Sequence, residues 1–163
     1  MTPLDAFRAY IGPLTWDDLV TGYDFDFLTP REIQLEVPGE GFAVQRLRAL
    51  EGSALGTFEA HLWAACAEAV GKTPRPGSAR WSQAQDRWRD VLIREALATE
   101  STASQLARNV ERLYEQVGCP EDMLAMLKPS QPWSGTPATV DPAAVQRFLD
   151  RSRDGARRHG AAS

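Results

Sequence analysis

The sequence predicts an all-α fold, a compact bundle of about seven or eight short-to-medium helices. Residues that begin helices (threonine, serine, proline) and glycines that end them recur along the chain, with apolar residues at helical spacing between them. Strand-like alternation is poor, so we expect no sheet of three or more strands. Apolar residues make up 43% of the chain and charged residues 25%, as in an ordinary globular domain.

Capping patterns define the helices of the N-terminal half. Thr15 and Thr29 are each followed three residues later by an acid, Asp18 and Glu32, which is the spacing of a capping box. Pro30 also occupies the first helical position, where proline is favoured. The helices expected in this half begin at Thr2-Pro3, Thr15, Thr29, Phe42 and Leu55, and they end at Gly12-Pro13, Gly22, Pro38-Gly39, Gly52 and Gly71.

The C-terminal half contains the longest expected helix, which begins at Ser78. Trp81 and Trp88 are seven residues apart on it, so we expect both to point into one core, and we interpret its charged face as solvated. Ser101 or Thr102 begins the next helix. Short helices are expected after Pro120 and Asp141. The expected organisation is a helical domain over 1–127, a Pro/Ser/Gly-rich linker over 128–140, a C-terminal helix over 141–150 and a disordered basic tail over 151–163.

Negative charge is concentrated near the N-terminus. Residues 1–40 hold eight acids against two arginines, a net charge of −6, whereas the whole chain carries −4. Such a surface repels nucleic acid and attracts basic protein partners. Helix capping accounts for Asp18 and Glu32. The acids that it leaves without a folding role are our candidate partner-binding residues: Asp17, Asp24, Asp26, Glu36 and Glu40.

Catalytic and metal sites find little support. His61 lies near Glu59, but a zinc site needs three or four ligands and the only other histidine is in the tail. Cys119 precedes Pro120 without a histidine placed to activate it, so we expect a capping or packing role. Asp24 and Asp26 alternate as in a calcium loop, yet the glycine and polar ligands that should follow are missing. We therefore expect no metal and no cofactor.

Other classes of partner are also disfavoured. Leu28-Thr29-Pro30-Arg31-Glu32 echoes the opening of the DNA-reading domain of some response regulators, but no basic recognition helix follows. The longest apolar run, over residues 62–67, is too short to span a bilayer. The start of the chain lacks the basic and apolar segments of a secretory signal, and the two cysteines cannot form a disulfide scaffold. We expect a cytoplasmic protein with no nucleic-acid or membrane partner and with reduced cysteines.

Two stretches share a pattern with known proteins. The first comprises Leu14-Thr15-Trp16-Asp17-Asp18-Leu19, Gly22 and Leu28-Thr29-Pro30; the second comprises Glu100-Ser101, Val110, Tyr114, Gly118-Cys119-Pro120-Glu121-Asp122 and Pro132-Trp133. Over about residues 14–133 the chain resembles an uncharacterised family of small bacterial proteins, a domain of unknown function. The family pattern would place a second glycine near Asp26 and an aromatic residue at Cys119. Small acidic proteins of this kind also resemble immunity proteins, which bind and neutralise a cognate toxin.

These observations favour a non-enzymatic protein-binding domain, of which an immunity or antitoxin-like protein that neutralises a basic toxin is one form. One alternative is a small helical enzyme whose site is assembled from scattered residues such as Glu59, His61 and Cys119. Another is a structural subunit of a larger bacterial assembly. The three hypotheses differ in the genes expected beside this one, because an upstream toxin gene favours the first and a metabolic operon the second.

Overall fold

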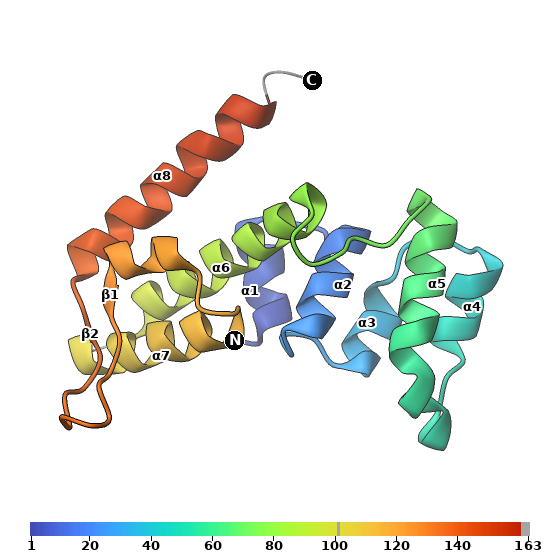
Figure 1. Cartoon of the computed structure of the whole chain (residues 1–163). Coiled ribbons are helices and arrows are strands. Elements are labelled where there is room, and N and C mark those ends of the chain that lie inside the picture. Colours follow the sequence, from blue (N-terminus) through green and yellow to red (C-terminus); the bar gives the residue numbers. More distant parts are fainter. Residues whose placement is uncertain (101, 161–163) are drawn as a thin grey trace. The chain divides into compact units, whose positions relative to one another are not determined.

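The computed structural model describes residues 1–100 and 102–160, with residues 153–160 described by their backbone alone (Figure 1). The described residues form eight α-helices, two short 3₁₀ helices and one two-stranded hairpin, which confirms the all-α fold. Two expectations, a cap at Ser101 and disorder at 161–163, lie outside the described residues. Within the described part of the chain, no helix is both long enough and apolar enough to cross a membrane.

The chain divides into two compact units, residues 1–88 and the residues from 89 onward. We expected a single helical domain over 1–127, so the observed boundary lies well before the expected one. The longest helix, α6 (Ala79–Thr99), contains this boundary, and its capping and periodicity mark its ends but not the change of unit. Periodicity reports that a helix has a buried face and leaves open which neighbours bury each part of it.

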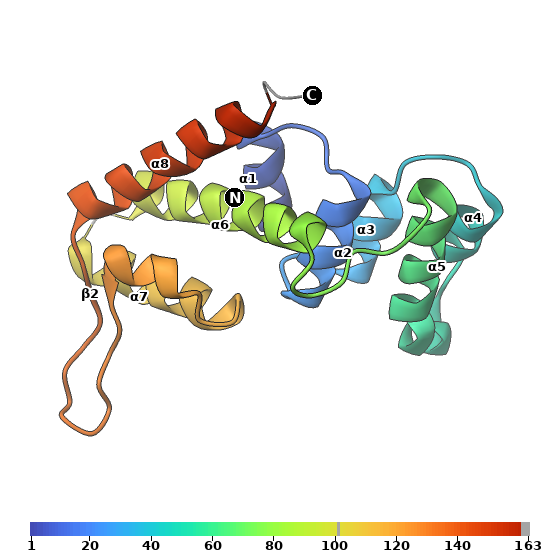
Figure 2. The same ribbon diagram turned by 45° about the horizontal axis from the view of Figure 1, so that its top comes forward.

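The first unit contains five α-helices, one 3₁₀ helix and the first half of α6. Their bounds are α1 (Pro3–Tyr10), α2 (Trp16–Asp24), α3 (Pro30–Glu36), α4 (Phe42–Arg48), η1 (Gly52–Thr57) and α5 (Phe58–Val70). Both predicted capping boxes form, at Thr15–Asp18 and Thr29–Glu32, and a third forms at the start of α1. Helices α4 and α5 pack side by side (Figures 1 and 2).

Aromatic side chains form the core of this unit. The ring of Trp88 lies 4.5 Å from that of Phe7 and 5.4 Å from that of Phe27, between centroids, and Trp81 meets Phe25 at 5.6 Å. Trp88 is fully buried and Trp81 nearly so, which confirms that both tryptophans point into the core. Aromatic pairs of this kind add specific geometry to a large hydrophobic contribution.

The second unit contains the rest of α6, followed by α7, a 3₁₀ helix, a hairpin and the last helix. Their bounds are α7 (Ala103–Gln116), η2 (Glu121–Ala125), β1 (Leu127–Lys128), β2 (Thr139–Val140) and α8 (Pro142–Gly160). Thr102 caps α7 as expected, by accepting a hydrogen bond from the backbone N–H of Gln105. Arg89, on α6, forms two hydrogen bonds with Asp122 and lies over the ring of Phe148 of α8.

The expected linker over 128–140 is wrong, because this segment is a β-hairpin. Leu127 pairs with Val140, Lys128 pairs with Thr139, and a further bridge joins Gln131 to Thr136. The prolines and glycine that indicated a linker form the turn instead, since the same residue types suit both structures. With only two residues in each strand, the hairpin lacks the alternating run that would predict it.

Helix α8 also differs from expectation, because it continues past Asp150 to Gly160. Val145, Phe148 and Leu149 anchor its first turns in the second unit, where all three are buried. Apolar residues are missing beyond this point, which is why we ended the helix at residue 150. The arginines and alanine of the extension are good helix formers, so the backbone can continue without an apolar face.

Candidate functional site

The structure separates the five candidate partner-binding acids into two groups. Three of them have arginine partners within the first unit: Asp17 pairs with Arg80, Glu36 with Arg8, and Glu40 with Arg48. The expectation that these three have no folding role is therefore wrong. Their partners lie 8 to 63 residues away in the sequence, beyond the reach of capping arguments. The second group consists of Asp24 and Asp26, for which the structure describes no ion pair with an arginine.

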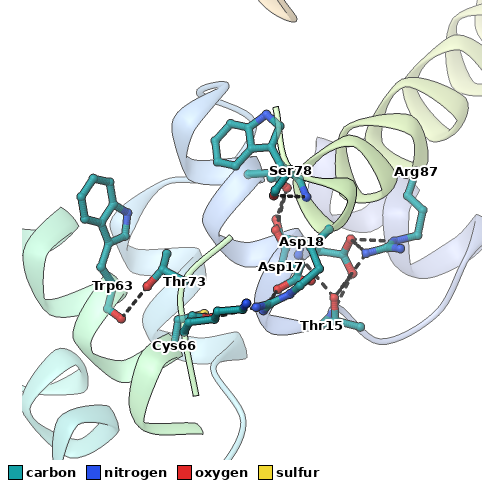
Figure 3. A network of polar contacts seen from close by, with 12 residues as sticks. Thr15, Asp17, Asp18, Trp63, Cys66, Thr73, Ser78 and Arg87 are labelled. Atoms are coloured by element: carbon teal, nitrogen blue, oxygen red, sulfur yellow. Dashed lines mark hydrogen bonds and ion pairs between the residues drawn. The ribbon is translucent and has the colours of Figure 1, made fainter. Parts of the chain in front are cut away.

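The N-terminal end of α2 is joined to α6 by paired charges (Figure 3). Arg80 donates two hydrogen bonds to Asp17, at 2.9 and 2.5 Å, and Arg87 donates to Asp18 at 2.7 Å. The two arginines are seven residues apart and hence on one face of α6. We interpreted the charged face of α6 as solvated, and for these two arginines that interpretation is wrong, because neither residue type nor spacing reveals a partner on another helix.

Asp18 forms several hydrogen bonds at this end of α2, through both its side chain and its backbone. Its side chain is 1% exposed, and it accepts hydrogen bonds from Thr15 at the helix cap as well as from Arg87. Its backbone carbonyl accepts a hydrogen bond from the indole nitrogen of Trp88 at 2.9 Å. A buried carboxylate satisfied in this way supports the fold, and it is not open to a ligand.

The C-terminal end of α2 differs from its N-terminal end. Here the chain makes a turn that includes Asp24 and Asp26. The carbonyl of Gly22 accepts hydrogen bonds from the N–H groups of both Phe27 and Leu28, whose side chains are buried. Asp26 occupies the left-handed region at φ +56°, a conformation that aspartate tolerates better than most residues. Because the apolar residues of this turn face inward, Asp24 and Asp26 remain on the surface.

Glu59, in the first turn of α5, joins these two acids at one pocket. The ring of Tyr23 meets that of Phe58 at 5.3 Å and so brings the end of α2 next to the start of α5. The pocket has a volume of about 540 Å³, is open to solvent, and is lined by Tyr23, Asp24, Asp26, Leu28, Thr29, Pro30 and Glu59. We call it the acidic pocket. Glu59 is not among the predicted partner-binding acids; the sequence pointed to it only as a neighbour of His61 and as part of the alternative enzyme site.

The acidic pocket carries negative charge that no described basic side chain compensates. Among the residues whose side chains the structure describes, no arginine or lysine forms an ion pair with Asp24, Asp26 or Glu59. Burial raises the pKa of Asp24, and the carboxylates of Glu59 and Asp26 raise it further. Burial followed by the same two neighbours also raises the pKa of Tyr23. The pocket therefore favours a positively charged occupant.

The residues of the alternative enzyme hypothesis do not form such a cluster. The Nδ1 atom of His61 hydrogen-bonds the carbonyl of Thr57, the last residue of η1, at 2.9 Å. Cys119 belongs to the other unit and is exposed, which corrects the expected packing role. The expected N-cap role is also wrong, because Pro120 is the N-cap residue of η2. The backbone N–H of Cys119 donates to the carbonyl of Tyr114, and this bond closes the end of α7. Both cysteines are free, as expected.

Metal binding finds no support in the arrangement of ligands. Across residues 1–100 and 102–152, no three or more His, Cys, Asp or Glu side chains gather in a way that could hold a metal ion. Asp24, Asp26 and Glu59 thus line a pocket without forming a coordination sphere. The geometry suits a larger cation, such as a guanidinium or ammonium group, that several carboxylates can contact from different sides.

Comparison with known proteins places this chain in no family. No family model, no curated protein and no solved structure matches it. The resemblance to an uncharacterised bacterial family stays a prediction. The acidic pocket is therefore the feature of this chain that bears on its function.

Proposed function

We propose that this chain is a non-enzymatic protein-binding domain that recognises a basic protein partner through the acidic pocket. The observation that carries the proposal is the group of three carboxylates, on Asp24, Asp26 and Glu59, that line one pocket and have no ion pair with any side chain that the structure describes. Elsewhere in the same unit, Asp17, Glu36 and Glu40 each have an arginine. Arginines thus pair with these three acids, whereas the described part of the chain supplies no ion pair to the three acids of the pocket.

The physical argument concerns repulsion and its relief. Like charges held close together destabilise a folded chain unless a counter-charge arrives. An arginine or lysine from a partner would supply that counter-charge and would form charge-assisted hydrogen bonds, which are stronger than neutral ones. The acidic field would also steer a basic partner toward the pocket and raise the association rate at low salt.

An immunity or antitoxin-like role is the finer form of this proposal. In that role the partner is a basic toxin, such as a nuclease, and binding neutralises it. The small acidic chain and its uncompensated pocket fit an inhibitor of this type. The partner to test first is the product of the gene adjacent to this one.

The experiment measures the association rate of the purified chain with that gene product at two salt concentrations. The test variant, Asp24→Asn/Asp26→Asn/Glu59→Gln, removes the three pocket charges. The control variant, Glu51→Gln/Glu115→Gln/Glu121→Gln, removes the same charge from exposed positions elsewhere. We expect the test variant to associate at least about tenfold more slowly and with less salt dependence, because steering changes rates by such factors. Equal rates for the two variants would contradict the proposal.

A further inference from the structure

Helix α5 has a second apolar face that points away from the core. Phe58, Leu62, Ala65 and Cys66 are buried and form its inner face. The outer residues at helical spacing are also apolar, and they are Ala60, Trp63, Ala64, Ala67 and Val70. We call them the α5 stripe. Trp63 and Val70 are each 47% exposed, whereas a surface helix of a globular protein carries polar residues on its outer face.

Acidic residues border the α5 stripe on both sides. Glu59, a member of the acidic pocket, lies four residues before Trp63 and hence one turn away on the helix surface. Glu68 lies four residues after Ala64 on the other border, where its carboxylate also accepts the backbone N–H of Ala43 at the start of α4. The stripe and the acidic pocket therefore form one surface, apolar along its length and negative at its margins.

We infer that this surface binds a positively charged amphipathic α-helix of a protein partner, laid along α5. The inference rests on the proposed function and specifies the kind of partner segment. The stripe spans residues 60–70, about 15 Å of helix, which matches roughly three turns of a partner helix. Its three alanines allow a second helix to approach closely, and Trp63 offers the large aromatic contact that dominates many interfaces.

Charge complementarity favours this occupant over a second copy of the chain. Two copies that met along α5 would bring the Glu59 and Glu68 side chains of both into one interface, and like charges there oppose association. An anionic lipid surface is disfavoured for the same reason. Basic residues flanking the apolar face of a partner helix would instead meet Glu59 and Glu68 on either side, with a further basic residue in the acidic pocket.

The test uses the full chain and two synthetic 18-residue peptides of identical leucine and lysine composition. One peptide has the leucines on one helical face, and the other is a scrambled sequence without that periodicity. Three variants are compared with the unaltered chain. Trp63→Ser/Val70→Ser alters the stripe. Leu35→Ser/Phe42→Ser is the control and alters apolar residues on α3 and α4 that are more exposed than those of the stripe. Asp24→Asn/Asp26→Asn/Glu59→Gln removes the pocket charges. Circular dichroism verifies that each variant is folded.

We expect the amphipathic peptide to bind at least about tenfold more tightly than the scrambled one, because burial of one aromatic side chain supplies such a factor. The stripe variant should lose this advantage and the control variant should keep it. Equal affinity for the two peptides, an advantage that survives in the stripe variant, or dimerisation of the chain through Trp63 in sedimentation would overturn the inference. If the pocket variant bound the amphipathic peptide as tightly as the unaltered chain does, that result would instead contradict the proposed function.

Discussion

The two ends of helix α2 carry the same kind of side chain in opposite circumstances. At the N-terminal end, Asp17 and Asp18 are paired with arginines of α6 and benefit from the positive end of the helix dipole. At the C-terminal end, Asp24 faces the negative end of the dipole and lies beside two further carboxylates. The acids at the N-terminal end stabilise the fold, whereas the repulsion among the acids at the C-terminal end destabilises it mildly. This difference underlies our proposal that the acids of the C-terminal end bind a partner.

Between the two ends, Trp88 holds the middle of α2 against α6. Its indole nitrogen donates to the carbonyl of Asp18, and its ring lies directly against Gly22. A Cβ atom at Gly22 would stand 2.8 Å from the ring of Trp88, closer than side chains pack. The packing of α2 on α6 thus depends on a few contacts of Trp88. Single substitutions can disrupt these contacts, so the comparison can be tested.

The largest effect is expected from Trp88→Ala. Removing a fully buried aromatic side chain leaves a cavity, takes one hydrogen bond from the carbonyl of Asp18 and should lower the free energy of unfolding by about 3–5 kcal/mol. Urea denaturation measures the loss. Trp133→Ala is the control, because Trp133 is 84% exposed and its removal should change stability by less than about 0.5 kcal/mol. An equal response of the two variants would show that the core is elsewhere.

A smaller loss is expected from Asp18→Ala, which breaks the capping box and strips Arg87 of its partner. Loss of a buried paired charge costs about 3–5 kcal/mol, and the partial exposure of Arg87 reduces the expected loss to about 2–3 kcal/mol. The matched variant Glu40→Ala removes an acid from an exposed pair with Arg48 and should cost at most about 1 kcal/mol. Thermal unfolding of both variants provides the measurement, and similar melting temperatures would contradict the structural role of Asp18.

Gly22→Ala should destabilise the chain by about 1–3 kcal/mol, because the added methyl group forces the ring of Trp88 or the side chain of Leu28 to move. Gly56→Ala serves as the control, since no atom lies within 4 Å of a Cβ atom at that position and its φ angle is not positive. Chemical denaturation of the two variants should give clearly separated midpoints. Coincident midpoints would mean that α2 and α6 approach less closely than described.

Asp24→Asn should increase the stability of the fold, and its effect should be the smallest of the four. The pKa of Asp24 is raised above its ordinary 3.8, so the stability contribution of this group is largest below that value and is lost as the pH rises through the folded-state pKa. The variant lacks this titration. Its stability should exceed that of the unaltered chain slightly at neutral pH, and the advantage should disappear toward pH 3. Unfolding curves across this range are the measurement, and a destabilised variant at pH 7 would contradict the account.

The local parts of this structure were predictable and the distant pairings were not. Thr15 and Thr29 predict their helices because a capping box is complete within four residues. The partner of Asp17, by contrast, is Arg80, which lies 63 residues away, and no local pattern reveals this pairing. Asp17 and Asp24 were therefore both candidate binding residues. Packing of Tyr23 on Phe58, which brings Glu59 to the pocket, is a tertiary contact of the same unpredictable kind.

The pKa of Asp24 tests the acidic pocket most directly. It is measured by NMR titration of the side-chain carboxyl group, first in the free chain and then in the presence of the amphipathic lysine–leucine peptide. In the free chain we expect a pKa above 3.8, because burial and the charges of Glu59 and Asp26 disfavour the carboxylate. Bound peptide should lower it, since a cation in the pocket favours the charged form. A pKa at or below 3.8 in the free chain, or one that the peptide leaves unchanged, would contradict a pocket whose charge is kept for a basic partner.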